Sequence, residues 1–327
     1  MLGAAVLALS LITAACTGGT APPARDTSAS SSPAAPATPT PGSATPTAAT
    51  TTRFAVIGDF GRADGNEKAV AKLVKSWKPG FIITVGDNYY GHAGGSAATR
   101  YDRVVGAYYC AWLAGVKSTS AKCPTGTATK NAFFPALGNH DYSDATPSLT
   151  TYLKYFNLPG AGFKNSSGNE RYYDFVEGSV HFFVVNSNPQ EPDGTSATSK
   201  QAAWLKKQLA ASTSTWNIVY DHHPPYSSDK THGSTKSLRW PFAAWGADAV
   251  ISGHAHTYER VQKNGIVYFV NGLGGASRYS FGKPVSGSKL RYRANWGAQF
   301  VTATATTLTF TFRTVSGKVV DTYRIKH

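Results

Sequence analysis

Cysteine is scarce in this chain, because only three of its 327 residues are cysteines: Cys16, Cys110 and Cys123. Neither Cys110 nor Cys123 has neighbours at the spacing of thiolate metal ligands, which argues against a zinc–cysteine site. Cys16 ends an apolar N-terminal segment, so the other two remain as a pair, and we expect them to form a disulfide in an oxidising compartment. Closing a loop of this size would stabilise the fold by about 3 kcal/mol.

Acidic residues are also few, with 18 Asp and Glu against 32 Lys and Arg, and the formal net charge is +14. A field of this sign attracts anionic substrates, anionic wall polymers or nucleic acid. No run of Lys and Arg is interleaved with aromatic residues, so we expect no nucleic-acid partner. Solubility of a basic exported protein explains the charge equally well.

Long apolar runs are missing as well. Residues 1–16 form an apolar segment that ends in small residues before Cys16, which is typical of a secretory signal and short for a membrane span. The position of Cys16 directly after Thr13-Ala14-Ala15 resembles a bacterial lipoprotein cleavage box, in which the cysteine becomes lipidated. An ordinary cleaved signal is the alternative.

We therefore expect an exported protein, anchored by a lipid on Cys16 to the outer face of a bacterial membrane. Residues 17–52 are almost wholly Ser, Thr, Pro, Ala and Gly, which have too little apolar surface to fold, and we expect a disordered linker there. Residues 53–327 are long enough for one large folded domain. We expect this domain to be monomeric.

The folded part begins with two apolar runs that both end in Gly-Asp, RFAVIGD at 53–59 and FIITVGD at 81–87. Between them, apolar residues at helical spacing predict a helix over Glu67–Lys78, which Pro79-Gly80 ends. A strand–helix–strand crossover brings the carboxyl ends of both strands to the same edge of a sheet. Asp59 and Asp87 should therefore meet.

More strands follow, and no long-period repeat is visible. Apolar runs that end in polar residues lie at 132–141, 216–223 and 247–256. Hairpins are predicted at 172–187, 258–272 and 300–327, with turns at Glu177-Gly178, Asn264-Gly265 and Ser316-Gly317. Thr198 to Gln201 fits a helix-capping pattern. Mixed strands with few helices favour an α/β fold, a four-layer αββα sandwich of two mixed β-sheets flanked by helices.

Five of the predicted strands end in residues that can ligate a metal ion: Asp59, Asp87, Asn139, His222, and the pair His254 and His256. Ligands of open α/β sheets bind at the carboxyl ends of strands, so these ends can converge on one place. Tyr90 adds a phenol to the loop that carries Asp87. Oxygen donors mixed with imidazoles suit iron, zinc or manganese better than calcium.

The same stretches form a five-block pattern: GDFG at 58–61, GDNYY at 86–90, GNHD at 138–141, VYDH at 219–222 and GHAH at 253–256. In this pattern the sequence resembles the purple acid phosphatases of the calcineurin-like metallophosphoesterase superfamily. GDNYY and AWLKKQLAA, at 203–211, are similar to the small, single-domain, tartrate-resistant type. GHAHTYER is similar to the plant type, whose large N-terminal domain has no room in this chain.

The resemblance implies a dinuclear metal centre in a catalytic domain over residues 53–327. Most members of the superfamily outside the purple acid phosphatases carry a histidine at the position of Gly61. The resemblance implies that Tyr90 takes the place of this histidine as a metal ligand. In the implied ligand set Fe(III) is held by Asp59, Tyr90 and His256, a divalent Fe, Zn or Mn ion is held by Asn139, His222 and His254, and Asp87 bridges the two. Anionic donors favour Fe(III), whereas an amide and imidazoles leave the second ion divalent.

The implied activity is hydrolysis of small phosphate monoesters under acidic conditions, by attack of a metal-bound hydroxide on phosphorus. His140 and His232 match the two family histidines that contact substrate and leaving group. His223 competes with His232, although adjacent residues of a strand point to opposite faces, which favours His232. A phosphodiesterase or nucleotidase on the same centre is one alternative, and a non-enzymatic cell-wall or metal-binding lipoprotein is another.

Overall fold

The structure, a computed structural model, describes residues 51–96, 99–114, 128–142, 149–159 and 166–327, which all belong to one compact unit. The signal segment with Cys16, nearly all of the predicted linker, and Cys123 lie outside these residues. Lipid attachment, a disordered linker and the disulfide therefore stay predictions. Within the described ranges, no helix has the length and apolar character that crossing a membrane requires.

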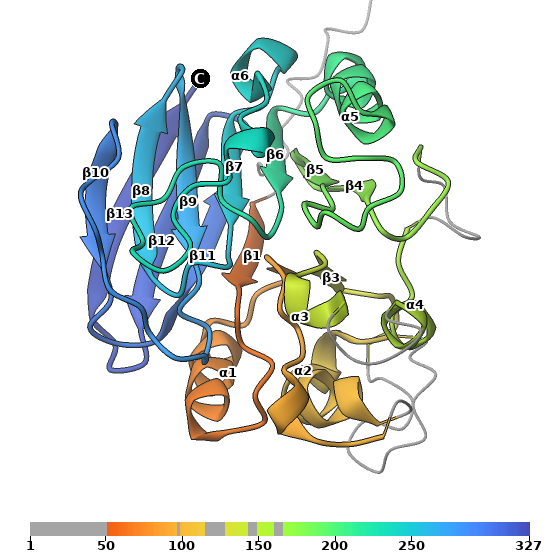
Figure 1. The fold of residues 1–327 in the computed structure, drawn as a ribbon, viewed down its shortest axis with the longest axis vertical. Coiled ribbons are helices and arrows are strands. Elements are labelled where there is room, and N and C mark those ends of the chain that lie inside the picture. The colour runs from red at the N-terminus through yellow and green to blue at the C-terminus, as the bar shows by residue number, and fades with distance from the viewer. Residues whose placement is uncertain (1–50, 97–98, 115–127, 143–148, 160–165) are drawn as a thin grey trace, which may run out of the picture. The chain divides into compact units, whose positions relative to one another are not determined.

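Two mixed β-sheets contain the described strands (Figure 1). The first sheet has the order β13 (Val319–Lys326), β12 (Thr307–Thr314), β11 (Gly297–Ala303), β1 (Thr52–Ile57), β2 (Phe81–Thr84) and β3 (Phe133–Pro135). The second has the order β10 (Ser288–Tyr292), β8 (Tyr258–Lys263), β9 (Ile266–Asn271), β7 (Ala249–Ser252), β6 (Trp216–Tyr220), β5 (Val180–Val184) and β4 (Tyr173–Glu177). Neighbours among β1, β2 and β3, and among β9, β7, β6 and β5, are parallel; the remaining pairs are antiparallel.

The helices are short apart from α1 (Gly65–Trp77) and α5 (Lys200–Ala211). The others are α2 (Ala107–Tyr109), α3 (Asn139–Tyr142), α4 (Thr150–Tyr155) and α6 (Phe242–Trp245), with single turns η1 (Gly91–Ala93), η2 (Asp102–Gly106), η3 (Cys110–Trp112) and η4 (Lys236–Leu238). Figure 1 places α5 and α6 together at the top of the view, and α1 and α2 at the bottom.

Alternation along the central strands separates two hydrophobic clusters, as the period of two in a strand requires. Phe182 of β5 faces the other sheet, where its ring centroid lies 5.0 Å from that of Phe54 on β1. The next residue, Phe183, belongs to the outer cluster with side chains of α5 and α6. On the first sheet, α1 packs through Trp77 on Phe300 of β11. The predicted αββα sandwich is therefore confirmed.

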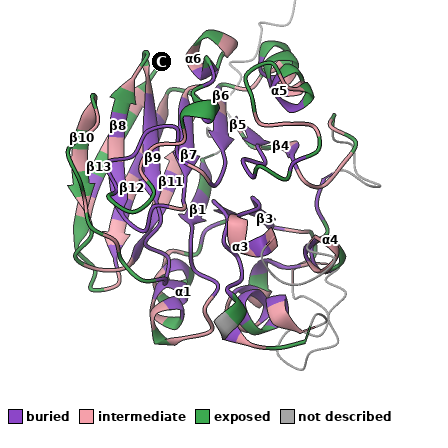
Figure 2. Ribbon diagram, in the orientation of Figure 1, coloured by how far each residue is buried: buried purple, intermediate pink, exposed green. Residues whose placement is uncertain are grey.

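Burial decreases from the middle of the second sheet to its edge (Figure 2). Every residue of β7 is buried, whereas no residue of the edge strand β10 is. β10 was not among the predicted strands, although Leu290 and Tyr292 are partly buried and alternate with the exposed Lys289 and Arg291, because two apolar residues are a weak signal. The Asn264-Gly265 hairpin is as predicted, since both residues have positive φ, 52° and 88°, as the turn between β8 and β9 demands.

The predicted start of α5 was wrong by one residue. Ser199, not Thr198, is the N-cap, and its hydroxyl accepts a hydrogen bond from the backbone N–H of Ala202 at 3.1 Å. Gln201 does not complete a capping box, because its buried amide donates to the carbonyls of Asn186 and Gly194 instead. A tertiary contact thus takes precedence over a local capping pattern.

Candidate metal centre

All seven predicted ligands follow the carboxyl ends of β1, β2, β3, β6 and β7, and the structure brings them together. Nε2 of His256 lies 3.1 Å from the Tyr90 hydroxyl and 3.4 Å from Oδ1 of Asp59. Nε2 of His222 lies 3.0 Å from Oδ1 of Asn139 and 3.3 Å from Oδ1 of Asp87. The first group contains the ligands implied for Fe(III), and the second contains ligands implied for the divalent ion together with the implied bridge, Asp87.

The last ligand, His254, is tied to the first group through its backbone. Its N–H donates to the Asp59 carboxylate, with both oxygens at 3.0 Å. Its ring centroid lies 5.0 Å from that of His222. Donor atoms of Asp59, Asp87 and His222 also lie within 4.8 Å of one another, which makes this trio a candidate metal site.

Three of the predicted ligands have backbone conformations that residues with a Cβ rarely adopt. Asp59, Asp87 and His254 have φ values of 57°, 52° and 65°. Each such residue costs on the order of 1–3 kcal/mol, which only the surrounding contacts can offset. A site that holds its donor atoms in fixed directions would show backbone strain of this kind.

Gly61, the position of the missing histidine, has no room for a side chain. A Cβ there would lie 2.1 Å from the carbonyl oxygen of Asn88 and 2.5 Å from the backbone nitrogen of Tyr89. Two hydrogen bonds hold the loops this close: Tyr90 N–H donates to Gly61 O at 2.7 Å, and Gly61 N–H donates to Asp87 O at 3.3 Å. Glycine at this position therefore lets the Tyr90 loop reach the site.

The donor atoms of the cluster face one another mainly as lone-pair acceptors, with few protons to share between them. The protonation of the histidine rings therefore shows whether these residues fit a cation. Nδ1 of His222 bonds the carbonyl of Val85 at 2.8 Å, and Nδ1 of His256 bonds the carbonyl of Ser277 at 2.5 Å. A carbonyl only accepts, so both Nδ1 atoms carry hydrogen and the Nε2 atoms of the neutral rings present lone pairs. These lone pairs point at the oxygen donors described above.

The pKa values agree with this excess of acceptors. Burial lowers the pKa of His222, but the Asp87 carboxylate outweighs it and raises this pKa to about 10. Burial, followed by Asp87 and Asp59, raises the pKa of the Tyr90 phenol well above its usual value. The cluster therefore attracts either protons or metal cations, and these donors fit a dinuclear site.

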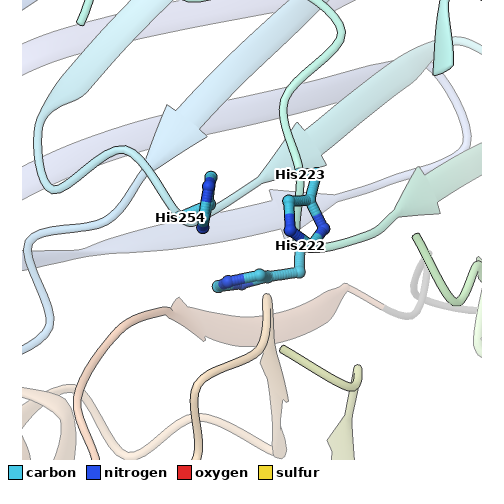
Figure 3. Close-up of side chains that lie close together, drawn as sticks. All are labelled: His222, His223 and His254. Carbon is cyan, nitrogen blue, oxygen red and sulfur yellow. The ribbon is translucent and has the colours of Figure 1, made fainter. Parts of the chain in front are cut away.

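His223 lies beside this cluster, and Figure 3 shows its ring next to those of His222 and His254. One nitrogen from each of the three rings lies within 4.8 Å of the others, so this trio is a second candidate metal site. The prediction that His223 points away from His222 was wrong. The two side chains do not alternate as they would in a strand, because β6 ends at Tyr220 and the chain bends at His222 and His223.

The hydrogen bonds of Ser187 determine the tautomer of His223. Its hydroxyl oxygen accepts the backbone N–H groups of His222, at 3.2 Å, and His223, at 2.9 Å, and lies 2.8 Å from Nδ1 of His223. With both lone pairs used, the hydroxyl donates its only hydrogen to this Nδ1. Neutral His223 therefore carries its hydrogen on Nε2, opposite to His222, and serves as a hydrogen-bond donor instead of a metal ligand.

His140 and His232 flank the cluster on two sides. The ring centroid of His140 lies 4.3 Å from that of Tyr90, and its backbone N–H donates to Oδ1 of Asp87 at 2.9 Å. His232 is exposed, and its ring centroid lies 4.0 Å from that of His254. Both predicted substrate histidines therefore border the predicted ligands.

Sequence reasoning missed several residues that support the site. Tyr279 stacks on His256, with ring centroids 4.1 Å apart and planes at 8°. Asp141, buried within the GNHD block, accepts hydrogen bonds from Gly138 N–H and from the Asn88 side chain, at 2.8 and 2.9 Å. Asp141 and Asn88 stand inside quoted motifs and could have been found there. Ser187 and Tyr279 stand in no motif and carry no sequence signal.

This fold, with donors of a dinuclear centre at the strand ends, defines a metallophosphoesterase. The chain belongs to the calcineurin-like phosphoesterase family, whose pattern matches residues 52–258. It is 28% identical over 254 residues to tartrate-resistant acid phosphatase type 5 of Rattus norvegicus, covering 69% of this chain and 73% of that one. The predicted family is confirmed, and its relatives are named acid phosphatases.

Solved structures show the same fold. A purple acid phosphatase from yellow lupin (Lupinus luteus) seeds has a TM-score of 0.64 and 17% identity, over 85% of this chain and 54% of that one. GAP50, the anchor in the inner membrane complex of Plasmodium, has a TM-score of 0.63 and 19% identity, over 84% and 89%. At these identities the likeness concerns the fold alone.

Proposed function

We propose that this protein is an exported acid phosphatase that hydrolyses phosphate monoesters at a dinuclear centre of Fe(III) and a divalent Fe, Zn or Mn ion. The observation that carries the proposal is the convergence of five strand ends on two groups of donors, joined by the buried carboxylates of Asp59 and Asp87. In the proposed assignment Fe(III) takes Asp59, Tyr90 and His256, the divalent ion takes Asn139, His222 and His254, and Asp87 bridges.

When bound, the two cations would supply charge for the phosphate and make a water molecule acidic enough to provide the nucleophile at low pH. The chain's own contribution is to orient the donors. The carbonyls of Val85 and Ser277 hold hydrogen on Nδ1 of His222 and His256, which leaves Nε2 of each ring for a cation.

Three histidines around the donors would handle the substrate. His223 presents Nε2–H, which Ser187 holds in place, and we assign it to a phosphoryl oxygen. His140 borders the Tyr90 side and contacts the substrate there. His232 is exposed at the rim beside His254, and it is the proposed donor of a proton to the leaving oxygen.

A comparison of two chromogenic substrates tests the proposal. Metal-loaded protein at mildly acidic pH should hydrolyse p-nitrophenyl phosphate faster than bis(p-nitrophenyl) phosphate, and a chelator should abolish both activities until metal is returned. Faster hydrolysis of the diester would favour the phosphodiesterase or nucleotidase alternative. No hydrolysis of either ester would overturn the enzymatic proposal and leave a binding lipoprotein.

We also propose that the chain is a monomer tethered to the membrane by a lipid on Cys16. The support is the sequence of residues 1–52 alone. Growth of producing cells with an alkyne-tagged fatty acid should label the wild type but not Cys16→Ser. Equal labelling of both proteins, or none of either, would overturn the tether. Sizing of the domain without residues 1–52 tests the monomer, and a dimer would contradict it.

Replacing Ser187 by Ala is expected to lower kcat/KM for p-nitrophenyl phosphate about tenfold, the effect of one charge-assisted hydrogen bond. The substitution frees the tautomer of His223 and removes no predicted donor atom, and because Ser187 also accepts the backbone N–H of the predicted ligand His222, metal analysis should show that metal content is unchanged. It also leaves the backbone N–H groups of His222 and His223 without their acceptor, and each lost bond costs about 1–3 kcal/mol of unfolding free energy.

Thr314→Val is the matched control, because buried Thr314 accepts the Lys318 N–H at 3.2 Å in the β12–β13 hairpin. It should lose stability in urea denaturation while keeping its activity. If Ser187→Ala has wild-type kcat/KM, the assigned role of His223 is wrong.

A further inference from the structure

The positive charge of the chain gathers on the segment that follows β9. Between residues 278 and 293 there are five basic residues and no Asp or Glu: Arg278, Lys283, Lys289, Arg291 and Arg293. None of the five pairs with a carboxylate in the part of the chain that the structure describes. Their charge is therefore free to attract an anion.

This segment also forms a wall of the candidate metal centre. We call residues 276–282 the rim segment. At one end, Ser277 accepts the hydrogen bond of His256 Nδ1, and Tyr279 stacks on the same ring. At the other end, Lys230 N–H donates to Ser280 O at 2.8 Å, which joins the rim to the loop that carries His232. The rim segment thus touches a predicted ligand and the loop of a predicted substrate histidine.

A cavity of about 410 Å³ lies between Arg278 of the rim segment and a second stretch of the chain, and its lining residues are Arg278, Arg293, Ala294 and Trp296. The guanidinium carbon of Arg278 lies 4.4 Å from the Trp296 ring centroid. Arg278 donates through Nη1 to the carbonyls of Arg293 and Ala294, and Arg293 donates through Nη1 to Tyr279 O at 3.2 Å. A guanidinium has five N–H donors, so both side chains keep donors for a ligand.

We propose that this cavity binds a second phosphate group of the substrate, so that the preferred substrates are small bisphosphates. The inference rests on the proposed phosphatase function and names its substrate class. Arg278 stands between Ser277 and Tyr279, which both contact His256, and consecutive Cα atoms are only about 3.8 Å apart. The backbone at Arg278 therefore lies next to a predicted ligand, and the proposal places the second phosphate of a small substrate at the Arg278 side chain.

The chemistry of the lining favours phosphate over other groups. Guanidinium groups bind phosphate oxygens through paired hydrogen bonds, and Arg is preferred over Lys where this geometry matters. The cavity carries two guanidiniums and no acidic side chain among its lining residues. This arrangement also gives part of the net charge a function, which is to capture the second phosphate group of a substrate next to the reacting phosphate.

The test compares phosphate release from fructose 6-phosphate and fructose 1,6-bisphosphate by the metal-loaded wild type and two double variants. Arg278→Gln/Arg293→Gln removes the cavity charges. Arg324→Gln/Lys326→Gln removes the same charge from β13, where these residues pair with Thr309 and Thr307 at the end of β12 opposite to the end that pairs with Gly297, next to Trp296. We expect kcat/KM of the wild type and of the control to be about tenfold higher for the bisphosphate than for the monophosphate. The cavity variant should have a ratio of these two values near two, because a bisphosphate offers two equivalent phosphate groups.

Circular dichroism and metal analysis of each variant show whether the rim segment and the centre remain intact. If an unfolded sample results, Arg278→Lys/Arg293→Lys replaces it, and this variant should have an intermediate ratio. A wild-type ratio near two, or a cavity variant that keeps the tenfold preference, would overturn the inference while leaving the phosphatase in place. Absence of hydrolysis of every ester, p-nitrophenyl phosphate included, would instead mean that the proposed function has failed.

Discussion

Asp87→Asn is expected to lower kcat for p-nitrophenyl phosphate by about a thousandfold or more, the largest effect of any single substitution in this chain. Oδ1 of Asp87 lies 3.3 Å from Nε2 of His222 and accepts the His140 N–H at 2.9 Å. Asparagine keeps the shape but removes the charge that would bridge two cations. Metal content per chain, measured by mass spectrometry, should fall along with activity.

Asp321→Asn is the matched control for this substitution. Asp321 is also buried, and it accepts hydrogen bonds from the Tyr258 hydroxyl at 2.9 Å and from Nε of Arg260 at 2.8 Å. The control should lose stability, because Arg260 keeps its charge without a partner, and it should retain metal and activity. If Asp87→Asn kept two metals and full activity, Asp87 would not be the bridge.

Tyr90→Phe is expected to remove the visible colour of the protein. A phenolate bound to Fe(III) gives a charge-transfer band that makes such proteins purple to pink, and phenylalanine has no oxygen to bind the ion. Loss of one ligand also weakens metal affinity by about 10- to 100-fold or more, so iron content and phosphatase activity should decline together. Absorption spectra of concentrated, iron-loaded protein provide the measurement.

Tyr89→Phe is the neighbouring control, since the Tyr89 hydroxyl donates to the carbonyls of Gly91 and Gly94, at 3.3 Å each. It should keep the colour. A wild type that is active and colourless with zinc in both positions would remove Fe(III) from the proposal but not the phosphoesterase. A Tyr90→Phe variant with an unchanged band would exclude Tyr90 as its source.

The fold was predictable where an apolar pattern and a turn signal agreed. The runs before Asp59, Asp87 and His222 are central strands, and their polar ends mark where each strand stops. Asn264-Gly265 predicted its hairpin because both residues tolerate positive φ. β10 was not predicted, because only Leu290 and Tyr292 carry its apolar alternation and this edge strand has no turn signal of the Asn-Gly kind.

The positions of the candidate ligands were predictable, but the residues that orient them were not. Motif spacing places polar residues at strand ends, and the topology of parallel strands then brings them together. Ser187 and Tyr279 reach the site only through tertiary packing, the first after β5 and the second in the rim segment. Their roles depend on hydrogen-bond direction and ring contact, which no local pattern encodes.

The central claim is that the five strand ends hold two metal ions that make this chain a phosphatase. Metal analysis and activity assays on the same purified sample test it most directly. We predict two metal ions per chain, at least one of them iron, with activity that is lost when a chelator removes them and returns when they are restored. Activity that survives complete removal of metal, or active protein with fewer than two ions per chain, would contradict the claim.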